Sequence, residues 1–489
     1  MIKNVFLCVL FALSSISYNA CAKADTLTDA ELVFEPCRIE LGAMTEDGEC
    51  ATLRRLEDPS DPNSKVLDLF AVKFPSSNPN PKPDAFTIIQ GGPGMSSIDM
   101  YMGKQNSFAQ IRRQRDILLI DQRGTGRSHA FMCPMDNPET MDESPEEVTK
   151  LALECIDQFD GNAEFYTTAR AVEDLDALRE ATGYPQLTVY GVSYGTRVGL
   201  EYLRAYPNNT RALLLDGVVA PTVNLAGSEI AVRSQQAFDR LVARCDADEA
   251  CKEAHGDLRA SFETVRALLI DSPASVKLIH PISGKMVDRE VGESDLLGAV
   301  RLMPYSTESL ALLPLMLTQA KQGQFTMLAA QAIQIEEQFA SNYAIGMNNS
   351  VLCSEDFPYL TDAEREPRQD TYFAGSMIEM IKAMCDVWPR SGDYSASRTL
   401  FDSDVPVLLM SGEYDPITPP SNAEVVDEML SNSRHVVVPA QGHGVFDRGC
   451  MAQITVNFVE QANFEEFDAS CVERQIPFPL FIDTTGPQQ

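Results

Sequence analysis

Residues Gly191–Gly195 read Gly-Val-Ser-Tyr-Gly, a G-x-S-x-G pattern that lies between two predicted elements. The β-branched run Leu187–Gly191 leads into it and predicts a buried strand, while Thr196–Tyr206 follows it and predicts a helix. Flanking glycines permit a strained turn that exposes the serine hydroxyl, and a helix N-terminus favours negative charge. These features predict that Ser193 is a nucleophile. The alternative is a glycine-rich turn whose serine has no role.

A nucleophilic serine needs a base, and the chain has five histidines. His443 lies in the glycine-containing loop 441–444, directly after the predicted strand His435–Pro439. Loops of this kind meet at the C-terminal edge of a parallel sheet, so His443 is the predicted base. The others lie in a charged helical stretch, a predicted hairpin, an Arg/Gly loop and the start of a strand: His255, His280, His129 and His435.

The imidazole in turn needs an acid that orients it and stabilises it when it is charged. Asp415 follows the predicted strand Val405–Ser411 and lies between Ser193 and His443 in the chain, which is the order that the turn motif requires. Glu413 is the competing acid. We favour Asp415 because a proline follows it and fixes the turn beyond it.

Acyl transfer also needs N–H donors for the oxyanion that develops on the attacked carbonyl. The residue after the nucleophile, Tyr194, supplies one in this motif. The glycine-rich loop Gln90–Gly94 follows an early predicted strand, and glycines let a backbone approach a substrate closely. We therefore predict Gly92 as the second donor.

These residues must be positioned by a scaffold, and the chain alternates short apolar runs with amphipathic stretches. Thr168–Thr182 is such a stretch, with Val172, Leu175 and Leu178 on one face. Strands that alternate with helices predict an α/β protein with a mostly parallel sheet covered on both faces. The predicted strands are Phe86–Gln90, Asp116–Asp121, Leu187–Gly191, Ala212–Asp216, Val405–Ser411 and His435–Pro439.

Between about residues 220 and 400 the pattern becomes helical, which predicts a cap domain inserted into the sheet domain. Helices are expected at Glu229–Arg244, Thr307–Gln322 and Gln369–Met384, with one hairpin formed by Val276–His280 and Met286–Val291. The predicted division is a signal peptide at 1–22, the first part of the core at 23–220, a mainly helical cap at 221–400 and the second part of the core at 401–489.

The first residues resemble a secretory signal. Lys3 precedes an apolar run over Val5–Leu13, and small residues ending at Ala22 supply a cleavage site. Export to the periplasm or the medium is therefore expected. Lipid attachment through Cys21 is disfavoured because Tyr18 stands where a lipoprotein signal usually has Leu.

The chain has twelve cysteines, and the ten beyond the signal are an even number, which is typical of disulfides in an exported protein. Sequence alone leaves the connectivity open. Neighbouring spacing suggests the pairs 37–50, 133–155, 245–251, 353–385 and 450–471 as a hypothesis. A metal site is disfavoured, since the sequence has neither a CxxC motif nor Cys and His at zinc spacing.

The composition is that of a folded protein, with 44% hydrophobic and 22% charged residues. The 39 basic and 71 acidic residues give a net charge of −32, which repels phosphate backbones and excludes nucleic acid as an expected partner. Outside the signal, the sequence has no apolar run long enough for an integral membrane span. The oligomeric state stays open.

Several segments together carry a resemblance to a known family. They are Gly91–Gly94, Asp121–Ser128, Gly191–Gly195, Leu215–Val219, Cys245–Cys251, Gly412–Pro419 and Gly442–Gly444. Over about residues 35 to 475 the chain resembles the proline iminopeptidase branch of the α/β hydrolases, including its secreted tripeptidyl-aminopeptidase-like members. The resemblance implies an α/β-hydrolase fold with a helical cap, and a serine exopeptidase that acts on peptides with a free N-terminus. It implies no metal and no organic cofactor.

An aminopeptidase must bind the ammonium group of its substrate, which calls for a carboxylate in the cap. Glu355 and Asp356 are the candidates, because they follow Cys353 and a disulfide there would anchor their loop. The alternative is an arbitrary surface pair. In the loop 121–128, Arg123 and Arg127 are expected to form salt bridges with Asp121 and so tie loops near the oxyanion donors; direct contact with the substrate is the alternative.

Two other functions remain open at this stage. A secreted carboxylesterase or lipase uses the same nucleophile, base and acid, and an apolar pocket without a site for an ammonium group would favour it. A non-catalytic binding protein on the same scaffold is disfavoured, because a binder has no need of all three residues.

Overall fold

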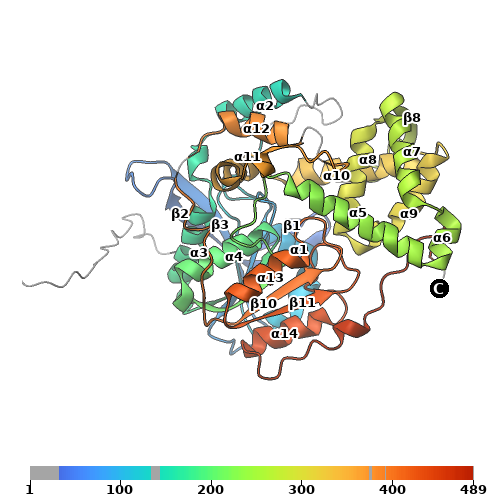
Figure 1. Ribbon diagram of the computed structural model, residues 1–489. Helices are drawn as coiled ribbons and strands as arrows, with labels where there is room; N and C mark the ends of the chain where they lie inside the picture. The colour runs from blue at the N-terminus through green and yellow to red at the C-terminus, as the bar shows by residue number, and fades with distance from the viewer. Residues whose placement is uncertain (1–31, 134–143, 374–376, 391, 488–489) are drawn as a thin grey trace, which may run out of the picture.

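The computed structural model describes residues 32–133, 144–373, 377–390 and 392–487 (Figure 1). The predicted signal peptide at 1–22 lies outside these residues. Within them, nine strands form one sheet in the order β1-β2-β3-β5-β4-β6-β7-β10-β11. In that order the strands span Glu35–Leu41, Met44–Leu56, Val66–Phe74, Ile117–Ile120, Ala85–Ile89, Leu187–Val192, Thr210–Asp216, Val407–Gly412 and Ser433–Val438.

The sheet is mostly parallel, as predicted. β5, β4, β6, β7, β10 and β11 pair in parallel, whereas β1, β2 and β3 form an antiparallel edge that joins the rest through β3 and β5. Every residue of β4, β5 and β6 is buried, because helices cover both faces. The six predicted strands are all present, with ends that shift by one or two residues.

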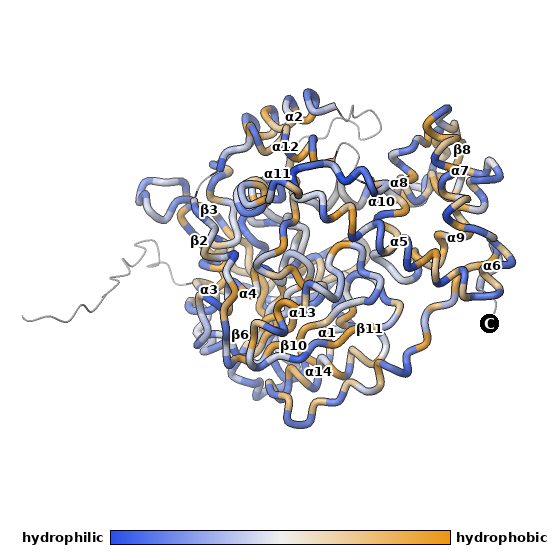
Figure 2. Tube along the Cα trace, in the orientation of Figure 1, coloured by the Kyte–Doolittle hydropathy of each residue, from blue (hydrophilic) through white to orange (hydrophobic). Residues whose placement is uncertain are grey.

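Two apolar cores lie on the two faces of the sheet. On one face pack α3 (Thr168–Thr182), α4 (Tyr194–Ala205) and α13 (Pro420–Met429); on the other pack α1 (Ser97–Arg112) and α14 (Met451–Gln461). Figure 1 shows α13 and α14 on opposite sides of β10 and β11. Figure 2 shows apolar segments at β6 and β10, inside the layers of helices. The helices therefore enclose the central strands, whose ends carry the predicted catalytic residues.

A third core belongs to a helical lobe between β7 and β10, which Figure 1 shows to one side of the sheet. The lobe consists of α5 (Glu229–Ala247), α6 (Glu249–His255), α7 (Leu258–Asp271), β8 (Ala274–Ile279), β9 (Met286–Val291), α8 (Glu293–Leu302), η4 (Met303–Tyr305), α9 (Thr307–Lys321) and α10 (Thr326–Asn342). The predicted hairpin is thus present as β8 and β9. Later parts of the predicted cap, α11 (Ile345–Val351) and α12 (Met377–Val387), pack instead in the core beside α3 and α4. The division into domains at 221 and 400 stays a prediction.

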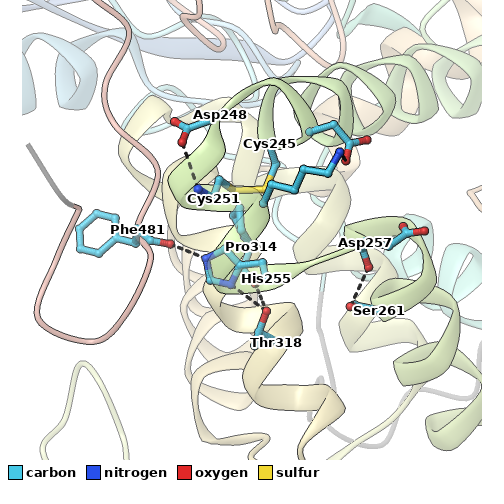
Figure 3. The surroundings of a disulfide bond; sticks show 11 residues. Cys245, Asp248, Cys251, His255, Asp257, Ser261, Pro314, Thr318 and Phe481 are labelled. Carbon is cyan, nitrogen blue, oxygen red and sulfur yellow. Dashed lines mark hydrogen bonds and ion pairs between the residues drawn. A yellow bond between two sulfur atoms is a disulfide. The ribbon is translucent and has the colours of Figure 1, made fainter.

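The disulfide hypothesis matches the structure at all five pairs: 37–50, 133–155, 245–251, 353–385 and 450–471. The pair Cys245–Cys251 joins α5 to α6 (Figure 3). At the end of α6, His255 hydrogen-bonds to Thr318 of α9 and to the carbonyl of Phe481 (Figure 3). The C-terminal segment is therefore attached to the helical lobe.

Among the described helices, none combines the length and the hydropathy needed to cross a bilayer.

Candidate active site

Ser193 occupies a strained turn between β6 and α4. Its φ of 58° and ψ of −128° lie in a region that residues with a side chain rarely adopt. The turn is tight on both sides: a Cβ at Gly191 would overlap the carbonyl of Gly195, and one at Gly195 would overlap the carbonyl of Ile89. The glycines of the motif are thus required sterically. The turn is also held by a hydrogen bond, which the Ser193 N–H donates to the carbonyl of Asp216 at 2.9 Å.

The structure brings the predicted base and acid together. His443 Nδ1 and Asp415 Oδ2 are 2.7 Å apart, and the acid side chain is fully buried. Asp415 Oδ1 accepts the N–H groups of Ile417 and Thr418 at 2.9 and 2.8 Å, and Oδ2 also accepts the Thr418 hydroxyl at 2.7 Å. Glu413, the competing acid, instead accepts the Ala440 N–H at 2.8 Å. The contacts therefore favour Asp415 as the partner of the imidazole.

Ser193 and His443 border the same short segment at the end of β7. Asp216 supplies the carbonyl that accepts from the Ser193 N–H, and a Cβ at the next residue, Gly217, would lie 2.8 Å from His443 Cε1. With Nδ1 held by Asp415, the imidazole has Nε2 available for a serine hydroxyl.

The sequence analysis did not assign the side chain of Asp216 a role. Its buried carboxylate accepts the N–H groups of Val445 and Phe446 at 2.8 to 2.9 Å and the Tyr190 hydroxyl at 3.0 Å. It therefore holds the backbone directly after the His443 loop. The signal available in the sequence was an acid at the end of an otherwise apolar strand, which is costly to bury unless it is hydrogen-bonded.

The two buried carboxylates set the charge of the imidazole. Burial lowers the pKa of His443, but the charges of Asp415 and Asp216 outweigh this effect and raise it above the ordinary value. Conversely, burial raises the pKa of Asp415, but His443 and the N–H donors outweigh it and lower the pKa. Both directions favour a charged imidazole held by an ionised carboxylate, which is what a base needs after it takes a proton.

The loop of the predicted oxyanion donor lies directly against the nucleophile. A Cβ at Gly91 would be 2.6 Å from Ser193 Cβ and 3.1 Å from its Oγ. Gly92 has a φ of 112° and precedes Pro93 through a cis peptide bond. Tyr194 is the first residue of α4, so its N–H has no carbonyl one turn earlier in that helix to which it could donate. Tyr194 thus follows Ser193 directly in the chain, and the loop that contains Gly92 approaches Ser193 at Gly91.

Among the described residues, Asp121 forms no salt bridge with Arg123 or Arg127. It instead links the neighbouring loops by hydrogen bonds. Asp121 accepts the Ser96 hydroxyl at 2.7 Å and the backbone N–H of Arg127 at 3.0 Å. Arg123 pairs instead with Asp174 at 2.7 and 2.9 Å. The prediction chose the acid that is nearest in sequence, whereas the fold brings α3 to this guanidinium.

The contacts of Asp356 do not support the expectation that it binds a substrate ammonium. Asp356 is fully buried and forms a bidentate pair with Arg197 at 2.9 and 3.0 Å, with Arg398 adding a contact at 3.2 Å. Two guanidinium groups compensate its charge, so it has no reason to bind a third cation.

Glu355 is also buried, and it accepts the N–H and the hydroxyl of Thr168, both at 2.6 Å. Burial raises the pKa of its carboxyl to about 7, against the opposing charge of Arg197. Both acids lie in the turn Leu352–Asp356, which the Cys353–Cys385 disulfide anchors as expected. The pair therefore supports the scaffold and does not form an open anionic site.

The helical lobe contacts the catalytic loop through η4. The His443 N–H donates to the Tyr305 carbonyl at 3.0 Å, and the two rings lie 5.0 Å apart at 62°. Gly442 has no room for a Cβ, which would overlap the Pro304 carbonyl. On the other side of the site, a Cβ at Gly92 would lie 3.2 Å from the ring of Tyr343. Residues between β7 and β10 thus adjoin both the base and the oxyanion loop.

The alpha/beta hydrolase fold family matches residues 84–449 of the chain, a range that contains every predicted catalytic residue. The protein belongs to the α/β hydrolases. Its strained serine turn, its sheet and its inserted helical lobe are those expected from the resemblance.

Curated relatives of this α/β hydrolase carry peptidase and esterase names. Serine protease Hip1 of Mycobacterium tuberculosis is 27% identical over 431 residues, which cover 79% of this chain and 80% of the relative. Tripeptidyl aminopeptidase of Streptomyces lividans is 23% identical over 80% of this chain and 77% of its own. Carboxylesterase B of Mycobacterium tuberculosis is 31% identical, but the match covers only 41% of this chain and 42% of the relative. These matches support a serine hydrolase of the α/β fold.

Proposed function

We propose that this serine hydrolase is an exported exopeptidase that cleaves peptide bonds near free N-termini. The observation that carries the proposal is the arrangement around Asp216 and Gly217: the strained Ser193 and the ring of His443 both border this segment, and Asp415 holds Nδ1 of that ring. The peptidase assignment draws on the two peptidase-named relatives, which align over about four fifths of the chain. Export draws on the five disulfides.

In the proposed mechanism Ser193 Oγ attacks the carbonyl carbon of the scissile bond while His443 Nε2 takes its proton. The N–H groups of Gly92 and Tyr194 stabilise the oxyanion. His443 then delivers the proton to the leaving amine, which departs and leaves an ester on Ser193. Water, deprotonated by the same imidazole, attacks the ester; the bond to Ser193 Oγ breaks, the imidazolium returns its proton to that oxygen, and the acyl product is released as a carboxylic acid.

A matched pair of substrates tests the assignment. Tripeptidyl p-nitroanilides with a free and with an acetylated N-terminus are compared, with Ser193→Ala as the blank. We expect kcat/KM to be at least about tenfold higher for the free amine, because acetylation removes a charge-assisted hydrogen bond that contributes about 1.5 kcal/mol or more. Equal or faster cleavage of the acetylated compound would reject the aminopeptidase and keep the serine hydrolase.

A carboxylesterase is the second candidate, favoured by the partial match to Carboxylesterase B. Turnover of p-nitrophenyl butyrate without turnover of either anilide would select it. Labelling by a fluorophosphonate probe in the wild type and its loss in Ser193→Ala separates both enzymes from a non-catalytic binding protein.

A further inference from the structure

Arg301 lies in the last turn of α8, directly before the η4 turn that packs on the catalytic loop. The carbonyls of Pro304 and Tyr305 touch Gly442 so closely that a side chain there is excluded. The Tyr305 carbonyl also accepts the His443 N–H. Because Arg301 precedes Tyr305 by about one helical turn, its backbone is fixed relative to the catalytic base.

The charge of Arg301 is not compensated by an acid among the described residues. Within these residues its side chain forms no ion pair and no hydrogen bond, and its Nε is shielded from solvent without an acceptor. Two other arginines of the lobe contact acids: Arg289 contacts Asp295 at 2.8 Å and also Glu336, and Arg266 contacts Glu293 at 2.6 Å. A helix C-terminus stabilises a cation by a few tenths of a kcal/mol to about 1 kcal/mol, which does not replace an acceptor for a shielded N–H.

The neighbours of Arg301 place it at the substrate site. Arg301 precedes Tyr305 by four residues, about one helical turn, so the two side chains lie on the same side of this segment. In agreement with this, the charge of Arg301 opposes the rise in pKa that burial causes at the Tyr305 and Tyr343 hydroxyls. The Tyr305 ring lies 5.0 Å from the His443 ring, and the Tyr343 ring contacts the position of Gly92. An acyl group bound to Ser193 must extend between the base and the oxyanion loop, which these two rings border.

We propose that Arg301 binds a carboxylate of the substrate and so selects peptides that carry one close to the scissile bond. A guanidinium accommodates a carboxylate in a bidentate geometry that neither an amide nor an ammonium group reproduces. The carboxylate has two possible sources, an Asp or Glu side chain and the C-terminus of a short peptide. The peptide nature of the substrate rests on the proposed function; the recognition of a carboxylate rests on Arg301.

Two substrate pairs distinguish the sources. Ala-Ala-Glu p-nitroanilide is compared with its Gln counterpart, and tetra-alanine is compared with its C-terminal amide. The wild type should prefer the carboxylate member of one pair by about ten- to a hundredfold in kcat/KM, the range of a hydrogen bond to a charged group. Arg301→Gln should lose this preference while it retains turnover of the neutral member, and Arg301→Lys should keep part of it. Arg266→Gln, a matched change at a paired arginine of the lobe, should keep all of it.

A second readout does not depend on peptide cleavage. Ala-Ala-Glu and Ala-Ala-Gln, both as C-terminal amides, and free tri-alanine compete with a fluorophosphonate for Ser193. Selective protection by a carboxylate-bearing peptide in the wild type and its loss in Arg301→Gln would support the inference even if no peptide is cleaved, an outcome that rejects the proposed function alone. Absence of any preference for a carboxylate in the wild type would overturn the inference. So would an Arg301→Gln variant that loses activity equally on charged and neutral members, because that is the signature of a structural role.

Discussion

Two carboxylates act on the imidazole of His443, and they come from different strand ends. Asp415, after β10, contacts Nδ1, whereas Asp216, at the end of β7, binds the backbone that follows the histidine. The first contact fixes the tautomer. The second holds the loop in place and adds negative charge nearby, so the two side chains support the same base in different ways.

Asp415→Asn tests the first contact. The amide cannot stabilise the imidazolium, and we expect kcat to fall by about 10³- to 10⁴-fold with little change in KM. Glu413→Gln is the matched control, since its carboxylate accepts the Ala440 N–H and an amide oxygen can replace it there. Steady-state kinetics on the best substrate measure both. A larger loss of kcat in Glu413→Gln than in Asp415→Asn would mean that Asp415 is not the catalytic acid.

Asp216→Asn tests the second contact through the pH profile. The base must be neutral to act, so activity falls as the pH decreases through the pKa of His443, which lies above the ordinary value of about 6.5. The charged groups that face the ring are Asp415 and Asp216, while Thr418 and Tyr305 are neutral. Removing one negative charge should move the acid limb of kcat/KM to lower pH.

Tyr190→Phe is the control for that shift, because it removes a hydrogen bond to Asp216 and leaves the charge in place. Its acid limb should stay where the wild type has it. An unshifted limb in Asp216→Asn, with reduced kcat, would mean that Asp216 only supports the loop.

At the scale of elements, the serine turn depends on close packing of α4 on β4. Gly195→Ala would place a Cβ into the carbonyl of Ile89, and a backbone group cannot move aside as a flexible side chain can. We expect a loss of about 1 to 3 kcal/mol in the free energy of unfolding and slower labelling of Ser193 by a fluorophosphonate. Gly298→Ala, within α8 and with no described atom within 4 Å of the added Cβ, should instead stabilise by up to about 1 kcal/mol. Thermal unfolding measures both variants, and the change in stability should be a loss in Gly195→Ala and a gain in Gly298→Ala.

Elements with a local signature were predictable from the sequence. The helix Thr168–Thr182 has the predicted bounds, because Val172, Leu175 and Leu178 form its buried face and Gly183 ends it with a φ of 75°. The edge strands β1 to β3 were not predicted. In β2 charged and partly exposed residues such as Glu46 and Asp47 hide the apolar pattern, and pairing with β1 and β3 forms the strand.

Partners that are distant in sequence were not predictable. Arg197 pairs with Asp356, which lies 159 residues away in the chain. The sequence around either residue does not show whether the acid is buried and paired with an arginine or exposed and available to a ligand. For the same reason Arg123 was assigned to the nearby Asp121 and not to Asp174. The nucleophile, base and acid were accessible because each follows a strand whose end the parallel topology brings to one edge of the sheet.

At the scale of the whole molecule, the C-terminal segment links the sheet to the helical lobe. After α14 the chain leaves the sheet, and Leu480 becomes buried in the apolar core of the lobe. The Phe481 N–H donates to the Ala311 carbonyl at 3.0 Å, and its own carbonyl accepts from His255 (Figure 3). Because η4 of this lobe binds the His443 loop, the segment and the active site are connected through the lobe.

Leu480→Ala tests this link. Truncating a side chain that is 3% exposed leaves a cavity, and we expect the lobe to lose about 2 to 5 kcal/mol of stability. Ile476→Ala in the same segment, at a side chain that is 90% exposed, should change stability by less than about 0.5 kcal/mol. Circular dichroism and residual fluorophosphonate labelling are followed together during heating. In Leu480→Ala both signals should be lost at a lower temperature and in one transition, since the lobe holds the His443 loop. Labelling that survives after the lobe has unfolded would show that the catalytic loop keeps its geometry without it.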